Sequence, residues 1–297
     1  MIDRRTFLAA AAASLAAGCT RRGAAEPSAS DPALDARFEA IRATLGPGGR
    51  LGVAAIDTGS GRELRFDADS RYAMASTFKL PLAAFALHLV ESGELSLDEE
   101  LPFGPGDPLD NSPTVEANLA LGRLPVRQLC AAIVEVSDNS AANILLRRTG
   151  GPEALTGFLG RCGDPVTRLD RFEMELNSNL PGDPRDTTSP AAMAALVRKL
   201  VLGDALAEEN RNRLQLWMKK SVPGPNRLKA GLPSPPWLVG HKTGTGANGN
   251  VNDVAIAWRS GRPPILIACY QSGGDAELPA RAAAHASVGR LVAEVFT

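Results

Sequence analysis

The spacing of hydrophobic and polar residues differs between the two ends of the chain and its middle. Short apolar runs at residues 50–57, 62–67, 237–245, 251–259 and 264–271 have the length and flanking turn residues of β-strands. Residues 33–45 place apolar side chains at helical spacing, and residues 275–296 have the pattern of a closing helix. Between about 77 and about 219 the pattern predicts helices separated by loops. We therefore expect strands from both chain ends to form one sheet.

These elements predict an α/β fold of the α+β type. We expect a five-stranded antiparallel sheet flanked by the terminal helices, with an all-α lobe inserted between the strands. The sheet lobe would comprise about 33–68 and 220–297, and the helical lobe about 69–219. Because ligand sites lie preferentially between lobes, we expect the functional site in a cleft there.

Residues 1–18 have the features of an export signal. Arg4 and Arg5 precede a weakly apolar run at 7–17, which is shorter than the ~20 residues of a membrane-spanning helix. The arginine pair resembles a twin-arginine signal. "LAAGC" resembles a lipobox ending at Cys19, although Ala16 stands where leucine is usual. We expect export to the periplasm or the outer face of the membrane. The product would be a lipoprotein anchored through Cys19 or a secreted form, and 19–32 would be a flexible tether.

Composition and charge narrow the class of function. The chain is 44% hydrophobic with a net charge of −1 and only 5% aromatic residues, so neither a basic surface nor a stacking platform for nucleic acid is expected. With Cys19 set aside, the remaining cysteines are odd in number and widely spaced, and the three histidines are scattered. We therefore expect no metal site and no cofactor.

The stretch "MASTFKLP" places Ser76 and Lys79 at the start of an expected helix. Positions i and i+3 share a helix face, so Lys79 can reach the Ser76 hydroxyl and take its proton. Free N–H groups at the helix start could also stabilise an oxyanion. Alone, this spacing is common by chance, and an N-cap serine beside a surface lysine would be the favoured interpretation.

Two further motifs favour the catalytic interpretation of Ser76 and Lys79 over the structural one. Ser137-Asp138-Asn139 lies between two expected helices, and Lys242-Thr243-Gly244 lies in an expected strand. The order S-x-x-K, S-D-N, K-T-G resembles that of the penicillin-recognising serine enzymes. "EMELN" at 173–177, in the long polar loop 168–188, resembles the E-x-x-L-N of class A β-lactamases. The resemblance covers residues 33–296 and includes "SDNSAANILL" and "RDTTSP". The chain is thus identified as a class A serine β-lactamase.

The resemblance implies a two-step hydrolysis of penicillins and cephalosporins that gives antibiotic resistance. Ser76 would attack the lactam carbonyl and form an acyl-enzyme. Glu173, oriented with Asn177, would then deprotonate the water that removes it. Whether Lys79 or Glu173 is the base for acylation is left open.

The resemblance also assigns supporting roles. Ser137 would pass a proton to the lactam nitrogen, and Lys242 would supply positive charge beside Ser137 and the substrate carboxylate. The N–H groups of Ser76 and Thr245 would form the oxyanion hole. Further substrate contacts are expected from the strand residues Thr243 and Gly244, and from Asn139, which would bind the substrate's side-chain amide. Asp138 would be structural.

Three assignments are specific to this sequence. Arg227 is the arginine expected to bind the substrate carboxylate, the alternative being a surface arginine on a loop. Asn111 occupies the gatekeeper position of the cleft. Arg171 and Asp186 match an ion pair that joins the ends of the 168–188 loop, the alternative being a solvated surface pair.

Two other functions use the same nucleophile. A D,D-peptidase (a penicillin-binding protein) would release the lactam adduct slowly, and a non-hydrolytic β-lactam sensor would stay acylated. The Glu173–Asn177 motif favours the hydrolase over the peptidase, and the sensor is disfavoured because no transmembrane or signalling segment is expected after the domain. For the hydrolase, the expected partners are small-molecule β-lactam substrates, and the expected state is a monomer.

Overall fold

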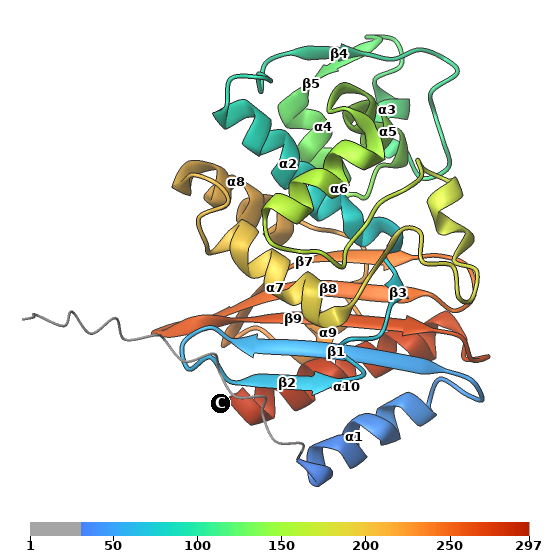
Figure 1. The fold of residues 1–297 in the computed structure, drawn as a ribbon, viewed down its shortest axis with the longest axis vertical. Coiled ribbons are helices and arrows are strands. Elements are labelled where there is room, and N and C mark those ends of the chain that lie inside the picture. The colour runs from blue at the N-terminus through green and yellow to red at the C-terminus, as the bar shows by residue number, and fades with distance from the viewer. Residues whose placement is uncertain (1–30, 297) are drawn as a thin grey trace, which may run out of the picture.

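The computed structural model describes residues 31–296 (Figure 1). The predicted export signal, Cys19 and nearly all of the predicted tether lie outside the described residues. The last tether residue, Pro32, already begins helix α1 (Pro32–Ala43), because the Asp31 side chain accepts a hydrogen bond from the Ala33 N–H and caps the helix.

A single five-stranded sheet forms the centre of the molecule. Its strands are β1 (Arg50–Asp57), β2 (Glu63–Phe66), β7 (Trp237–Thr245), β8 (Val251–Arg259) and β9 (Arg262–Ser272), in the order β2-β1-β9-β8-β7. All neighbours are antiparallel, and β1 pairs with β9 from Arg50 opposite Ser272 to Asp57 opposite Ile265. The fold class expected from the sequence is therefore confirmed.

The two terminal helices cover one face of the sheet. Helix α1 and helix α10 (Leu278–Phe296) pack together there, and the short helix α9 (Leu228–Gly231) packs against α10 (Figure 1). Gly231 permits this approach, since a Cβ atom at that position would lie 2.1 Å from the Ala286 carbonyl oxygen. The core on this face includes Phe38, Val53 and Leu291, each 2% exposed or less.

The other face carries the helices from the middle of the chain (Figure 1). They are α2 (Lys79–Glu91), α3 (Pro113–Ala117), α4 (Val126–Glu135), α5 (Asn139–Arg148), α6 (Gly151–Arg161), α7 (Pro190–Val201) and α8 (Glu208–Lys219). Helix α2 is central, with all nine residues from Lys79 to Leu87 buried. A helix buried all round needs apolar residues on every side, which explains its uninterrupted run of Leu, Ala, Pro and Phe.

Four short strands were not predicted. β3 (Tyr72–Ala73) pairs with β6 (Thr187–Thr188), and β4 (Glu100–Pro102) pairs with β5 (Arg123–Pro125). They lie in the 69–219 region, so the inserted lobe is not purely helical. Strands of two or three residues are too short to leave an alternating pattern in the sequence.

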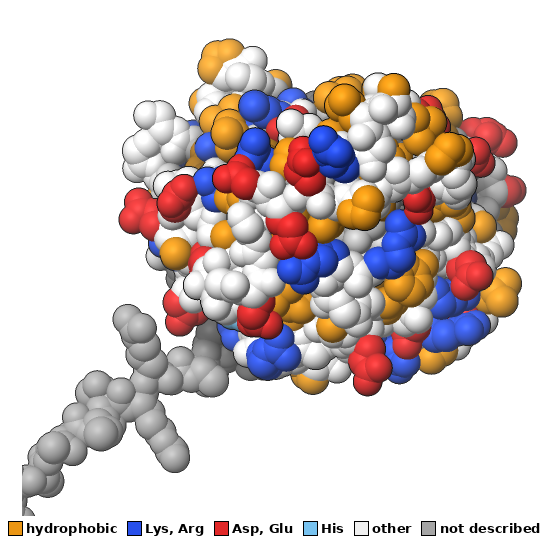
Figure 2. Space-filling model, turned by 90° about the horizontal axis from the view of Figure 1, so that it is seen from above, with side chains coloured by type: hydrophobic (Ala, Val, Ile, Leu, Met, Phe, Trp, Pro, Cys, Tyr) orange, Lys and Arg blue, Asp and Glu red, His pale blue; other side chains and the backbone are white. Residues whose placement is uncertain are grey.

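The surface has mixed charge. On the face seen from above, basic and acidic side chains are interspersed and neither sign dominates (Figure 2), in keeping with a net charge of −1. Between residues 31 and 296, the structure contains no helix with the length and hydropathy needed to cross a bilayer.

Candidate active site

The structure brings the five predicted catalytic residues together at the edge strand β7. Ser76 lies in a 3₁₀ turn, η1 (Ala75–Phe78), that leads into α2. Ser137 lies between α4 and α5, Glu173 in the 168–188 loop, and Lys242 in β7. Ser76 is half-buried and the other four residues, Lys79 included, are buried. Segments more than 150 positions apart in the sequence therefore supply one cluster.

Lys79 lies at the centre of this cluster. Its Nζ donates to Ser76 Oγ at 3.1 Å and to the Ser137 carbonyl at 2.9 Å, and it also hydrogen-bonds Asn139 Oδ1. Glu173 Oε1 lies 2.9 Å from the same nitrogen, and neither side chain is exposed. Burial lowers the pKa of Lys79, although the Glu173 charge opposes this. The lowered pKa makes a neutral amine, which can accept the Ser76 proton, more accessible.

Lys242 forms the second half of the cluster. Its Nζ donates to Ser137 Oγ at 3.0 Å and to the Thr243 carbonyl at 2.7 Å. Burial holds the pKa of Lys242 well below its usual value, and the charges of Lys79 and Arg227 lower it further. Ser137 itself has a left-handed backbone, with φ of 63°, a conformation that non-glycine residues adopt at a cost of roughly 1 kcal/mol. Its hydroxyl is thereby held against one lysine and its carbonyl against the other.

Glu173 is held by two asparagines. Asn177 Nδ2 donates to Glu173 Oε2 at 2.6 Å. Asn143 in α5 binds the main chain of Glu173 with two hydrogen bonds. Its Oδ1 accepts from the Glu173 N–H (2.9 Å), and its Nδ2 donates to the Glu173 carbonyl (2.8 Å). Among the described residues, Asn177 Oδ1 accepts no hydrogen bond, whereas Glu173 Oε1 faces Lys79 Nζ at 2.9 Å. One buried acceptor beside the Glu173 carboxylate is therefore open to a water molecule.

Sequence reasoning missed Asn143. The signal was present in "SDNSAANILL", since Asn143 lies four residues after Asn139 and so on the same face of α5. An asparagine on an apolar helix face that also carries a motif residue is a candidate for anchoring the neighbouring loop.

The ends of the 168–188 loop are joined by a buried ion pair. Arg171 Nε lies 2.6 Å from Asp186 Oδ2, and Asp186 has no exposed side-chain surface. Asp186 Oδ1 also accepts from the N–H groups of Asp170 (2.7 Å) and Arg171 (3.0 Å). The pair is therefore not a solvated surface contact, and it fixes the base of the loop that carries Glu173.

Asp138 connects two helices. Its Oδ1 accepts from the Ala141 N–H at 2.8 Å and caps α5, while its Oδ2 accepts from the Thr114 (2.8 Å) and Val115 (3.1 Å) N–H groups at the start of α3. Both helix starts are positive ends of the backbone dipole, so one buried carboxylate stabilises the two together.

We predict that Asp138→Ala lowers the free energy of unfolding by roughly 2–4 kcal/mol, because it leaves two buried N–H groups and one partly buried N–H group without an acceptor. Urea unfolding followed by circular dichroism measures this. Ser189→Ala, which removes the single-bond cap of α7, is the matched control and should cost only about 1 kcal/mol. Equal losses in the two variants would contradict the bridging role.

Asn139 and Asn111 lie beside the Ser137 segment. Asn139 Oδ1 accepts from Lys79, and its Nδ2 donates to a main-chain carbonyl (2.6 Å) and to Met174 Sδ (3.1 Å). A substrate amide would therefore replace one of these contacts. Asn111 is exposed, has φ of 59°, and donates from Nδ2 to the Ser137 carbonyl at 3.1 Å. It lies at the rim, where a gatekeeper residue is expected.

Gly244 allows β7 to approach the nucleophile. A Cβ atom there would lie 2.8 Å from the Met74 carbonyl oxygen and 3.2 Å from the Ser76 nitrogen. Only glycine fits such an approach without displacing the main chain. The main chains at Gly244, Thr245 and Ser76 are thereby brought side by side, which is the arrangement that an oxyanion hole needs.

Arg227 is buried behind β7, with an exposed fraction of 6%, so it is not a surface arginine. Its Nη1 donates to the carbonyls of Gly244 (2.9 Å) and Asn252 (2.8 Å), and its Nη2 donates to Thr245 Oγ1 (2.7 Å). Burial lowers the pKa of Arg227, with the charge of Asp253 opposing. The Arg227 guanidinium therefore affects the exposed side of β7 indirectly, through its hydrogen bond to the Thr245 hydroxyl.

Comparisons with known proteins agree with this geometry. The model of the β-lactamase enzyme family matches residues 34–296. The chain is 42% identical to β-lactamase AST-1 of Nocardia asteroides, over 99% of this chain and 96% of that protein. It is also 42% identical to the carbapenem-hydrolysing β-lactamase KPC of Klebsiella oxytoca, over 83% of this chain and 84% of that one.

Solved structures give the same result. The chain is similar to the class A β-lactamase of the last common ancestor of Gram-negative bacteria, with a TM-score of 0.86 and 47% identity, covering 89% of this chain and 100% of that chain. Sequence, fold and site geometry lead to one conclusion: the chain belongs to the class A β-lactamase family.

Proposed function

We propose that the protein hydrolyses the β-lactam ring of penicillins and cephalosporins through an acyl-enzyme on Ser76, and so gives antibiotic resistance. The observation that carries the proposal is the position of Lys79, whose Nζ lies 3.1 Å from Ser76 Oγ and 2.9 Å from Glu173 Oε1. One amine thus contacts both the nucleophile and the base that a two-step hydrolysis requires.

In the first step, Ser76 Oγ attacks the lactam carbonyl carbon and gives its proton to the acylation base, Lys79 or Glu173. The carbonyl oxygen becomes an oxyanion beside the main chain of Ser76 and Thr245, where each N–H donor is worth about 3–4 kcal/mol. The ring C–N bond then breaks, its nitrogen takes a proton from Ser137 Oγ, and the proton that left Ser76 passes from the base to Ser137 and restores its hydroxyl. Lys242, 3.0 Å from that oxygen, stabilises the charge as the proton leaves.

In the second step, a water molecule hydrolyses the ester that joins the opened substrate to Ser76. Asn177 Oδ1, which accepts no hydrogen bond within the described residues, and the Glu173 carboxylate beside it would hold the water. Glu173 takes one water proton as the oxygen attacks the ester carbon, and the proton returns to Ser76 Oγ as the ester bond breaks. The products are the ring-opened acid and free enzyme.

The substrate's carboxylate would be bound at β7. Lys242 and the Thr245 hydroxyl are the groups of that strand suited to an anion, and Arg227 supports the hydroxyl from behind. Arg227 is therefore a positioning residue that acts through Thr245, which refines the direct contact expected from the sequence.

We predict that Arg227→Ala raises KM for carboxylate-bearing lactams about tenfold, the factor expected for losing one hydrogen bond to a charged group, with a smaller effect on kcat. Steady-state kinetics on a penicillin measures this. Thr245→Val, which removes the hydroxyl and keeps the arginine, should give a similar rise, and Arg227→Lys should recover part of the loss. Unchanged kinetics in Arg227→Ala would refute the assignment.

The function is tested with purified protein and a chromogenic cephalosporin, with absorbance and intact mass followed together. Rapid turnover without a lasting adduct is expected. A stable adduct on Ser76 would instead support the non-hydrolytic sensor, and slow release of the adduct would support the D,D-peptidase.

We also propose that the protein is exported and anchored to a membrane through a lipid on Cys19, acting there as a monomer on small-molecule lactams. The support is Arg4–Arg5, the short apolar run and the "LAAGC" stretch. Fractionation of cells that express wild type or Cys19→Ala tests this, because only wild type should be in the membrane fraction.

A further inference from the structure

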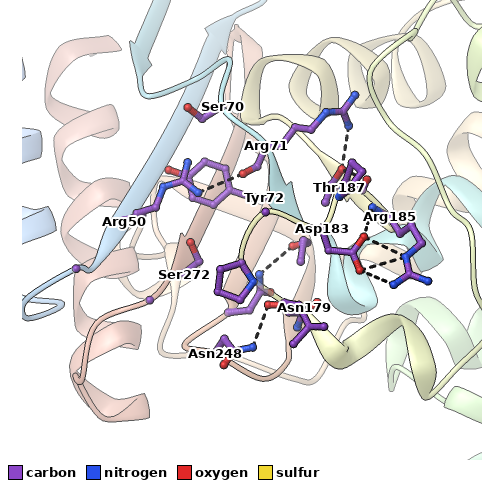
Figure 3. A pocket seen from close by; sticks show the side chains of 18 of the residues that line it. Arg50, Ser70, Arg71, Tyr72, Asn179, Asp183, Arg185, Thr187, Asn248 and Ser272 are labelled. Atoms are coloured by element: carbon purple, nitrogen blue, oxygen red, sulfur yellow. Dashed lines mark hydrogen bonds and ion pairs between the residues drawn. The ribbon is translucent and has the colours of Figure 1, made fainter.

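A pocket of about 440 Å³ lies under the 168–188 loop, apart from the active site (Figure 3). Its walls come from that loop, the start of β1, the segment around β3, and the turns at 248–250 and 272–273. None of the five catalytic residues lines it. The pocket is large enough for a small molecule, and the proposed hydrolysis does not use it.

The lining is cationic. Its charged residues are four arginines and one aspartate, and two further aspartates outside the lining, Asp67 and Asp186, pair with Arg50 and Arg171, so the local excess is one positive charge. Arg50 and Arg185 lie on opposite sides of the pocket (Figure 3). Hydrogen bonds from Arg185 lower the pKa of the single acid, Asp183, to about 2, so the count holds at neutral pH. The protein as a whole has a charge of −1, so this concentration of positive charge is local.

One of the four arginines lacks an acidic partner. Three form ion pairs with N–O distances of 3.2 Å or less: Arg50 with Asp67, Arg171 with Asp186, and Arg185 with Asp183. Arg71 Nη1 donates to the Val166 carbonyl (2.8 Å) and to Thr187 Oγ1 (2.9 Å), and Arg71 forms no ion pair within the described part of the chain. These two neutral acceptors orient the guanidinium without neutralising it.

The other groups in the pocket suit an oxyanion. The Ser272 hydroxyl is a neutral donor in the lining, and the central carbon of the Arg50 guanidinium lies 4.4 Å from the centroid of the Tyr72 ring. Guanidinium groups bind the oxygens of phosphate and carboxylate in a fork, with charge-assisted hydrogen bonds. The Arg71 guanidinium, which has no acidic partner within the described part of the chain, is therefore the group of the lining best suited to an oxyanion.

We propose that this pocket binds a small soluble oxyanion, held chiefly by Arg71 and assisted by Arg50 and Arg185. Arg71 belongs to the segment before β3, whereas Arg185 belongs to the loop that carries Glu173. The bound anion joins the loop to the body of the protein, so binding raises the melting temperature. This site is independent of the proposed hydrolysis.

The test uses the full chain and inorganic pyrophosphate, titrated calorimetrically at constant ionic strength with chloride as the balancing anion. We expect saturable binding of one pyrophosphate per chain and a rise in Tm. Arg71→Gln should weaken binding about tenfold or more, the factor for losing a hydrogen bond between charged groups, and should abolish the Tm rise. Arg71→Lys, which keeps the charge without the fork, should be intermediate.

The matched control is Arg290→Gln, which removes one exposed arginine of α10 and should bind pyrophosphate as wild type does. Hydrolysis of the chromogenic cephalosporin shows separately that each variant is folded. If Arg71→Gln does not fold, Arg50→Gln serves in its place and should also weaken binding. Non-saturable binding, or equal weakening in Arg290→Gln, would overturn the proposal.

Discussion

Glu173→Gln is expected to stop the reaction at the acyl-enzyme. Glutamine has nearly the volume of glutamate and can keep the contact with Asn177, but it cannot take a proton from water. General-base catalysis typically contributes about 10²- to 10⁴-fold, so deacylation should slow by that factor. Intact-mass spectrometry after mixing with a penicillin should show an increase equal to the whole lactam, because ring opening releases no fragment.

Two control variants test whether this result depends on the nucleophile and on the catalytic glutamate. Ser76→Ala should form no adduct, since it lacks the nucleophile. Glu175→Gln changes an exposed glutamate of the same loop and should turn over as wild type does. The rate of adduct formation in Glu173→Gln also bears on the acylation base, because a normal rate points to Lys79. If Glu173→Gln turns over normally, the proposed deacylation is wrong.

Lys79→Ala is expected to impair both chemistry and stability. Acylation should slow by about 10²- to 10⁴-fold, since the amine that contacts the Ser76 hydroxyl is lost. The Glu173 carboxylate, which has no exposed surface, would lose its cation, and breaking a buried pair from one side costs roughly 3–5 kcal/mol. Stopped-flow acylation and urea unfolding measure the two effects.

The double variant Lys79→Ala/Glu173→Gln separates the two effects. It should regain part of the lost stability, because a neutral amide replaces the unpaired carboxylate, but it should not regain acylation. Lys229→Ala, on the opposite face of the sheet in α9, controls for the loss of a lysine and should leave both measurements unchanged. A Lys79→Ala protein as stable as wild type would show that the pair with Glu173 does not stabilise the fold.

Much of the fold could be predicted because its strands are long and its motifs are local. The strands expected at 50–57, 237–245 and 251–259 match β1, β7 and β8 residue for residue. Each is apolar over most of its length and is bounded by turn residues, so tertiary contacts had little to override. The residues of the S-x-x-K, S-D-N and K-T-G motifs were likewise found together.

The features that could not be predicted depend on contacts between distant segments. The hydrogen bonds between Asn143 and the Glu173 main chain form only because the 168–188 loop passes over α5. No local sequence pattern predicts that contact. The second cap made by Asp138 depends on where α3 begins. Arg227 has an ordinary loop sequence around it, and only its hydrogen bonds to β7 and β8 in the folded chain show that it is buried and reaches Thr245.

The pairing of β1 with β9 has a consequence for how the protein is made. Arg50 pairs with Ser272, so the middle of the sheet joins residues more than 200 positions apart. During synthesis from the N-terminus, β1 emerges long before its partner and must wait with an unpaired edge. Closing so long a loop is slow, because its entropy is lost before the contacts form. The sheet can be completed only when β9 has been synthesised, so the nascent chain depends on whatever keeps β1 from pairing elsewhere in the meantime.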